Sequence, residues 1–71
     1  MKKVYAVICR NFLAGEYLMV ESQKRYGNKI RKVVKRPPHQ MYMVLSNGDE
    51  IHFVPEDRFE KWSIGRNYEI L

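Results

Sequence analysis

Residues 41–54, MYMVLSNGDEIHFV, have the pattern of a β-hairpin, and this stretch decides the predicted fold. Two runs rich in β-branched and aromatic residues flank Asn47 and Gly48, which both tolerate the positive φ angles of a tight type I′ turn. A two-residue loop of this kind fixes the register of the two strands. The register places four apolar side chains on one face, in the pairs Val44–Ile51 and Tyr42–Phe53.

A three-residue loop with a bulge is an alternative turn for the same hairpin. It shifts the register by one residue and pairs Met43 with Ile51 and Met41 with Phe53. These pairs are also apolar, so the alternative stays open. We favour the two-residue loop.

Two segments before the hairpin have features of strands. Residues 3–9, KVYAVIC, are almost continuously apolar, which is typical of a strand buried on both faces. Residues 29–35 have the pattern of a second strand, with Ile30 and Val34 on one side and mostly basic side chains on the other. This strand must end at Pro37 and Pro38, because neither proline has a backbone donor for a sheet.

Residues 12–26 fit two interpretations. As a helix they would begin at Asn11, which is a favourable capping residue. Gly15 and Val20 disfavour a helix, and a break near Gly15 would instead leave a strand over residues 16–22. We favour the strand.

The segment after the hairpin is expected to contain a short helix and a final strand. Pro55 and the acids that follow it suit a helix or 3₁₀ turn over residues 56–62. In residues 67–71, Tyr68 and Ile70 alternate with Glu69, which is the pattern of a strand. The chain then has five or six short strands with one short helix before the last strand. This pattern predicts a mainly β, small α+β fold, namely a compact and partly open barrel of SH3-like or OB-like type.

The end of the chain, GRNYEIL at residues 65–71, resembles the end of SH3 domains, where a 3₁₀ turn precedes a final strand with an Asn-Tyr pair. The resemblance covers these seven residues. The aromatic acidic motif and the paired tryptophans of SH3 domains have no counterpart in this sequence. The resemblance therefore implies an SH3-like architecture and no peptide-binding function.

The composition indicates one small domain over residues 1–71. Hydrophobic residues make up 45% of the chain, which is enough for a small core, but a domain of this size has no room for a deep active site. The single Cys9 and the absence of zinc-site spacing fit a reducing compartment, and we expect the cytoplasm. We expect neither a membrane span nor an export signal, because the apolar runs are too short for either.

Charge is distributed unevenly along the chain, whose formal net charge is +5. Residues 1–21 carry a net charge of +1, residues 22–40 carry +7 without any acid, and residues 41–71 carry −3. Segregation of this kind usually reflects the partners of a protein rather than its fold.

The basic middle segment is the candidate binding site. Residues two apart in a strand are separated by about 6.6 Å, a spacing that can follow successive phosphates, and Lys29, Arg31 and Lys35 would form such a row opposite Ile30 and Val34. An aromatic side chain at the adjacent turn would add a stacking surface. An alternative is that these cations only keep an edge strand soluble. The complete candidate set is Lys24, Arg25, Tyr26, Lys29, Arg31, Lys32, Lys35 and Arg36.

Other reactive residues are expected to have structural roles. His39 and His52 have no neighbours at a spacing that specifies a metal site or a catalytic triad. Cys9 lies in the most apolar segment and is expected to be a small core residue. Phe59 and Trp62 are expected to anchor their helix on the sheet. We therefore expect no enzymatic activity, no cofactor, no metal and no small-molecule substrate.

These observations predict a small binding module whose basic strand contacts nucleic-acid phosphates with little sequence specificity. The alternative is a small protein–protein effector, an inhibitor or adaptor of the type that phages or mobile elements encode, which would dock its basic strand or its acidic helix on a larger protein. The module is expected to be a monomer or a homodimer paired through edge strands.

Overall fold

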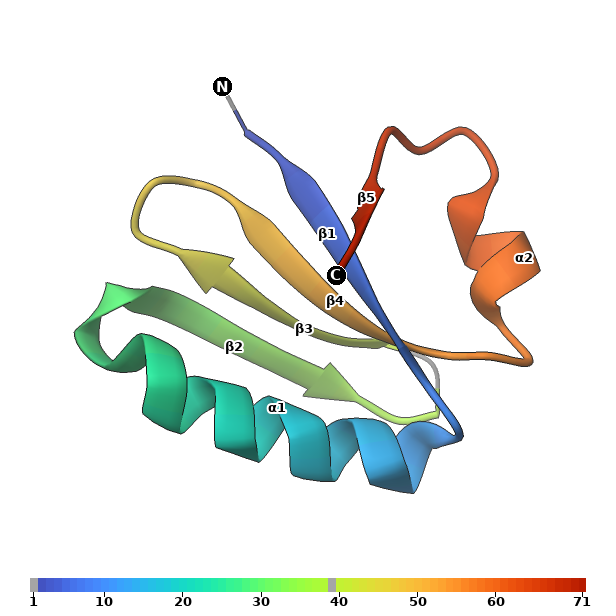
Figure 1. Cartoon of the computed structure of the whole chain (residues 1–71), viewed down its shortest axis with the longest axis horizontal. Coiled ribbons are helices and arrows are strands. Elements are labelled where there is room, and N and C mark those ends of the chain that lie inside the picture. Colours follow the sequence, from blue (N-terminus) through green and yellow to red (C-terminus); the bar gives the residue numbers. More distant parts are fainter. Residues whose placement is uncertain (1, 39) are drawn as a thin grey trace.

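The computed structural model describes residues 2–38 and 40–71. Its elements are β1 (Val4–Cys9), α1 (Phe12–Tyr26), the 3₁₀ turn η1 (Gly27–Lys29), β2 (Ile30–Arg36), β3 (Gln40–Leu45), β4 (Glu50–Pro55), α2 (Phe59–Ser63) and β5 (Glu69–Ile70). The five strands form one mixed sheet in the order β2-β3-β4-β1-β5 (Figure 1). β2, β3 and β4 are antiparallel neighbours, whereas β1 is parallel to both β4 and β5.

The sheet is open rather than closed, with β2 and β5 at its two edges. The structure therefore confirms a small α+β fold with a short helix before the last strand, but it does not confirm the SH3-like or OB-like barrel. The long helix α1 lies along one side of the sheet (Figure 1). In the described part of the chain, no helix has the length and the apolar character needed to cross a membrane.

The favoured strand over residues 16–22 is wrong, because this segment belongs to α1. Asn11 caps the helix as the alternative interpretation required, and its side-chain oxygen accepts a hydrogen bond of 2.8 Å from the Ala14 N–H. Gly15 is buried where the helix meets the sheet. A Cβ atom at Gly15 would lie 2.5 Å from Met41 Cε and 3.1 Å from Cys9 Sγ, so the glycine permits this close approach.

The hairpin uses the three-residue loop, so the favoured two-residue register is wrong. Met43 pairs with Ile51 and Tyr42 pairs with His52. The Leu45 N–H donates to the Asp49 carbonyl over 2.8 Å and closes the loop. Gly48 has a φ angle of 93°, which confirms that the turn needs a positive φ at this residue.

The shifted register decides which side chains enter the core. The core lies between α1 and the sheet, and Cys9 is 3% exposed within it, as predicted. Burial raises the pKa of the Cys9 thiol and keeps it protonated, although a backbone hydrogen bond at Val54 opposes the shift. The buried cluster consists of Cys9, Met19, Met41, Met43, Ile51 and Phe53.

The C-terminal elements are shorter than predicted. Pro55 is the last residue of β4, where it is the register partner of Cys9 in β1, and it does not begin a helix. A turn separates it from α2, which begins only at Phe59. The final strand is reduced to the two residues of β5.

Candidate nucleic-acid interface

The side of the sheet turned away from α1 carries the candidate site, and we call it the open face. Residues that are paired across neighbouring strands point to the same side of the sheet, so Val34, Tyr42 and His52 share one side. Side chains alternate between the two sides along each strand, so the other residues of this face follow from the same register. The short helix α2 covers only part of this face, over β4, by packing Trp62 against His52. Across β2, β3 and β4, the open face comprises Lys32, Val34, Arg36, Gln40, Tyr42, Val44, Glu50, His52 and Val54.

A β-bulge at the start of β2 changes which cations share a side of the sheet. Ile30 pairs with Leu45 on the α1 side, whereas Lys32 pairs with Val44 on the open face, so the alternation is interrupted at Arg31. The predicted arrangement, with Ile30 and Val34 on one side, is therefore wrong.

The predicted row of Lys29, Arg31 and Lys35 is also wrong. Lys29 belongs to the 3₁₀ turn η1, and Arg31 lies at the bulge. Lys35 is on the α1 side, where it forms an ion pair with Glu16 of the helix.

The remaining cations of the candidate set do not converge on one surface either. Lys24 forms an ion pair of 3.1 Å with Glu21 on α1, and Arg25 lies in the last turn of the same helix. Tyr26 is half-buried and packs against the core on the α1 side of the sheet. Of the eight predicted site residues, the structure places Lys32 and Arg36 on the open face.

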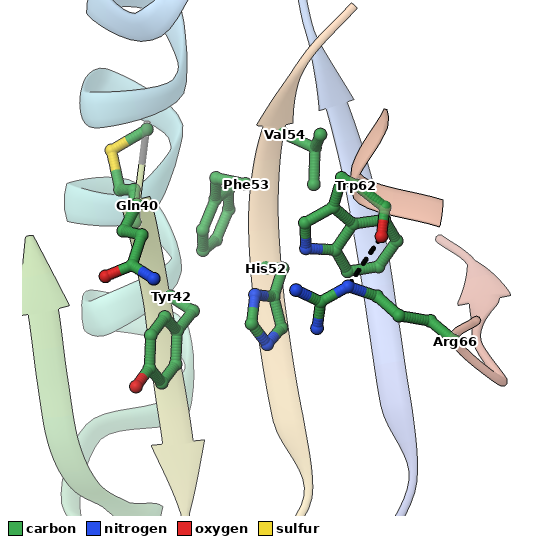
Figure 2. A pocket seen from close by; sticks show the side chains of 8 residues that line it. Gln40, Tyr42, His52, Phe53, Val54, Trp62 and Arg66 are labelled. Atoms are coloured by element: carbon green, nitrogen blue, oxygen red, sulfur yellow. Dashed lines mark hydrogen bonds between the residues drawn. The ribbon is translucent and has the colours of Figure 1, made fainter. Parts of the chain in front are cut away.

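The open face also carries a row of three aromatic rings, Tyr42, His52 and Trp62 (Figure 2). The rings of Tyr42 and His52 are stacked, with centroids 4.5 Å apart and an angle of 15° between their planes. The Trp62 ring follows at 5.3 Å from His52. Phe59 and Tyr68 pack around Trp62 at 6.0 and 5.3 Å, so Trp62 anchors α2 to the sheet as predicted.

His52 is buried within this row, at 8% exposure. Its Nε2 atom lies 2.8 Å from Glu50 Oε1, and Lys2 Nζ lies 3.0 Å from the other oxygen of this carboxylate. Burial lowers the pKa of His52, although the bond to Glu50 opposes the shift. Burial alone would raise the pKa of Glu50, but the bonds from His52 and Lys2 outweigh it and lower this pKa. The imidazole is therefore neutral at pH 7, and Lys2 compensates the charge of Glu50.

A pocket opens beside Trp62, and we call it the Trp62 pocket. Its volume is about 330 Å³, and it lies between the sheet and the turn after α2. Gly65, with a φ angle of 72°, turns the chain back so that Arg66 Nε donates to the Trp62 carbonyl oxygen over 2.6 Å. The Arg66 guanidinium then lies 4.7 Å from the centre of the indole ring. The pocket is lined by Gln40, Val54, Arg58, Lys61, Trp62 and Arg66.

A smaller hollow of about 40 Å³ joins this pocket to the aromatic row, and its lining includes Tyr42, His52, Trp62 and Arg66 (Figure 2). Chemically, the combined surface offers cations, aromatic rings and one side-chain amide. Within residues 2–38 and 40–71, no group of three or more His, Cys, Asp or Glu side chains is arranged to hold a metal ion. His39 lies outside the described residues, so the prediction for it is not addressed.

Sequence reasoning missed the cations of the Trp62 pocket. Arg58, Lys61 and Arg66 lie in the segment whose net charge is −3, and an average over that segment conceals them. The spacing of Arg66 four residues after Trp62 was an available signal, since a chain that turns back at Gly65 brings the two together.

No family model, curated protein or solved structure significantly matches this chain. The candidate site is therefore defined by geometry alone.

Proposed function

We propose that this chain is a small, non-enzymatic module that binds nucleic acid through phosphate contacts on the open face. One observation carries the proposal: Lys32 and Arg36 lie on the side of β2 that α1 leaves free, and the cations of the Trp62 pocket border the same face. Glu50, an acid on this face, is compensated by Lys2. A surface with this excess of positive charge attracts the phosphate backbone.

The spacing of the cations on β2 also suits contacts with successive phosphates along the backbone of a nucleic acid. Lys32 and Arg36 are four residues apart, which corresponds to about 13 Å along a strand and to about two phosphate steps of an extended nucleic-acid chain. Contacts of this kind position a ligand without reading its bases, so we expect little sequence specificity from them.

The buried, unpaired thiol of Cys9 suits a reducing compartment, and we propose the cytoplasm.

The test compares two double variants that remove the same charge from opposite sides of the sheet. Lys32→Gln/Arg36→Gln should weaken binding to oligonucleotides of any sequence and reduce the slope of log affinity against log salt by about 0.7 to 0.9 for each lost contact. Lys24→Gln/Arg25→Gln on α1 should leave the slope unchanged. Equal slopes for the first variant and the parent, or no affinity at low salt, would refute the proposal.

A protein-binding effector is the second candidate, and one feature of α1 favours it. Leu13, Tyr17 and Val20 form an apolar stripe on the outer side of the helix and are 74%, 67% and 48% exposed. Binding through this stripe should persist at high salt and be lost in Leu13→Ser/Tyr17→Ser. That result, together with no affinity for oligonucleotides, would replace the first proposal.

A further inference from the structure

We infer that the Trp62 pocket receives one unpaired base of a single-stranded nucleic acid together with its phosphate. This inference rests on the proposed function and goes further, because phosphate contacts alone would not distinguish single strands from duplexes. It is carried by the cations, the planar groups and the amide that line the pocket.

The charge of the pocket suits a phosphate. Arg58, Lys61 and Arg66 contribute three cations from the turn before α2, from α2 itself and from the turn after it. None of the six side chains that line the pocket is acidic. The planar fork of an arginine guanidinium can also hold two phosphate oxygens at once.

The shape and the polar group of the pocket suit a base. The Arg66 guanidinium lies over the Trp62 indole and occupies that face of the ring, and an arginine plane is itself a surface on which unpaired bases stack. Val54 adds an apolar wall. Gln40 brings an amide that can both donate to and accept from the edge of a base. A volume of about 330 Å³ is large enough for one base with part of its sugar.

The position of the pocket connects it to the phosphate contacts of β2. Gln40, at the wall of the pocket, is the register partner of Arg36 in the neighbouring strand. A single strand can therefore run from Lys32 past Arg36 and deliver its next base to the pocket beside Trp62. In a duplex the bases are stacked and paired, and one base would have to be flipped out to enter.

Trp62 is the one tryptophan of the chain, so intrinsic fluorescence reports directly on the pocket. The experiment titrates the protein with an oligothymidylate of about ten nucleotides, with a DNA duplex of equal charge and with base-free inorganic polyphosphate. We expect the single strand to bind about tenfold or more tightly than the duplex and to quench the emission of Trp62. Polyphosphate should bind without comparable quenching.

Two variants of equal charge locate the contact. Arg58→Gln/Lys61→Gln removes two cations that only a strand with a base in the pocket would reach, so it should weaken binding of the single strand more than binding of the duplex and reduce the preference by about tenfold. Lys24→Gln/Arg25→Gln, on the opposite side of the sheet, should keep the full preference. Circular dichroism verifies that both variants are folded.

The outcomes separate this inference from the function on which it rests. Equal, salt-dependent affinity for single strand and duplex, with unchanged Trp62 emission, would overturn the pocket assignment and leave the phosphate contacts of β2 intact. An unchanged preference in Arg58→Gln/Lys61→Gln would overturn it as well. No affinity for any of the three ligands at low salt would refute the proposed function itself.

Discussion

Gly15 shows how a residue that is unfavourable for a helix can be required by the tertiary structure. A helix-interior glycine lowers stability by about 0.5–1 kcal/mol relative to alanine, which is why Gly15 argued against α1 in the sequence. In the structure it lies against Met41 and Cys9, two side chains that are themselves buried. The space available to the residue, rather than its helix propensity, explains the glycine.

We predict that Gly15→Ala destabilises the protein despite its better helix propensity. The new Cβ would lie 2.5 Å from Met41 Cε, and although a methionine end can move, Cys9 Sγ at 3.1 Å restricts the space on the other side. Overpacking of this kind costs about 1–3 kcal/mol. Chemical denaturation measures the change, and Val20→Ala, at an exposed position of the same helix, should stay within about 0.5 kcal/mol. A more stable Gly15→Ala protein would show that the helix does not approach the sheet so closely.

His52 should make the stability of the protein depend on pH. Its pKa in the folded state is below the ordinary value of 6.5, chiefly because it is buried, so the unfolded chain binds more protons in this range. The contribution of His52 to the free energy of unfolding should therefore be constant above pH 6.5 and fall as the pH decreases from 6.5 toward the lowered pKa of the folded state. One such group gives a slope of at most about 1.4 kcal/mol per pH unit.

The matched variant for this prediction is His52→Gln, which cannot titrate. Its free energy of unfolding should be lower overall, because the stacking with Tyr42 is lost, but flat between pH 6.5 and 4.5. Below 4.5, the ordinary pKa of a glutamate, the parent should lose stability as Glu50 protonates, whereas His52→Gln lacks one of the bonds that lower this pKa and should lose less. Stability of the parent that increases toward pH 5 would mean that the pair with Glu50 outweighs burial and raises the pKa of His52.

At the scale of elements, the sequence predicted the β-hairpin and the strand β1 but not the hairpin register, and β1 is only partly buried, since Ile8 is 41% exposed. Both registers pair apolar side chains, so hydrophobic pattern alone could not separate them. The preference for the three-residue loop arises from local contacts: the Asn47 side chain accepts a hydrogen bond of 3.0 Å from the Asp49 N–H, and Gly48 supplies the positive φ angle that follows.

We predict that Gly48→Val destabilises the hairpin by about 1–3 kcal/mol, because a β-branched residue is strongly disfavoured at a φ angle of 93°. A Cβ atom at this position meets no atom within 4 Å, so the whole effect would come from the backbone. The thermal midpoint should fall by about 4–8 °C for each kcal/mol. Ser46→Ala, at an exposed position of the same turn, is the control and should change little. An unchanged midpoint for Gly48→Val would show that the turn has another conformation.

At the scale of the whole molecule, the candidate site depends on contacts that sequence patterns do not encode. The bulge at Arg31 redistributes the cations of β2 between two sides of the sheet, and the fold separates Lys32 and Arg36 from the other predicted residues. The pocket is assembled from β3, β4, α2 and the turn that follows, which are distant in sequence. The basic character of β2 was therefore predictable, whereas the location of the site and the cations of the Trp62 pocket were not.

This assembly leads to a last prediction, which separates a folded site from mere positive charge. The unfolded chain carries the same net charge of +5, so a purely electrostatic ligand would bind folded and unfolded protein alike and leave the thermal midpoint nearly unchanged. A ligand that needs Arg36, Gln40 and Trp62 side by side binds the folded state alone. At a ligand concentration of about 100 times Kd, this selectivity adds about 2.7 kcal/mol.

We therefore expect a single-stranded oligonucleotide at that concentration to raise the thermal midpoint by about 10–20 °C in low salt. Differential scanning fluorimetry or calorimetry measures the shift, which should disappear at high salt as the phosphate contacts are screened. The Lys32→Gln/Arg36→Gln variant should show a smaller shift than Lys24→Gln/Arg25→Gln at equal ligand concentration. A midpoint that stays constant or falls would mean that the oligonucleotide does not select the folded arrangement of the open face, and that charge alone accounts for its binding.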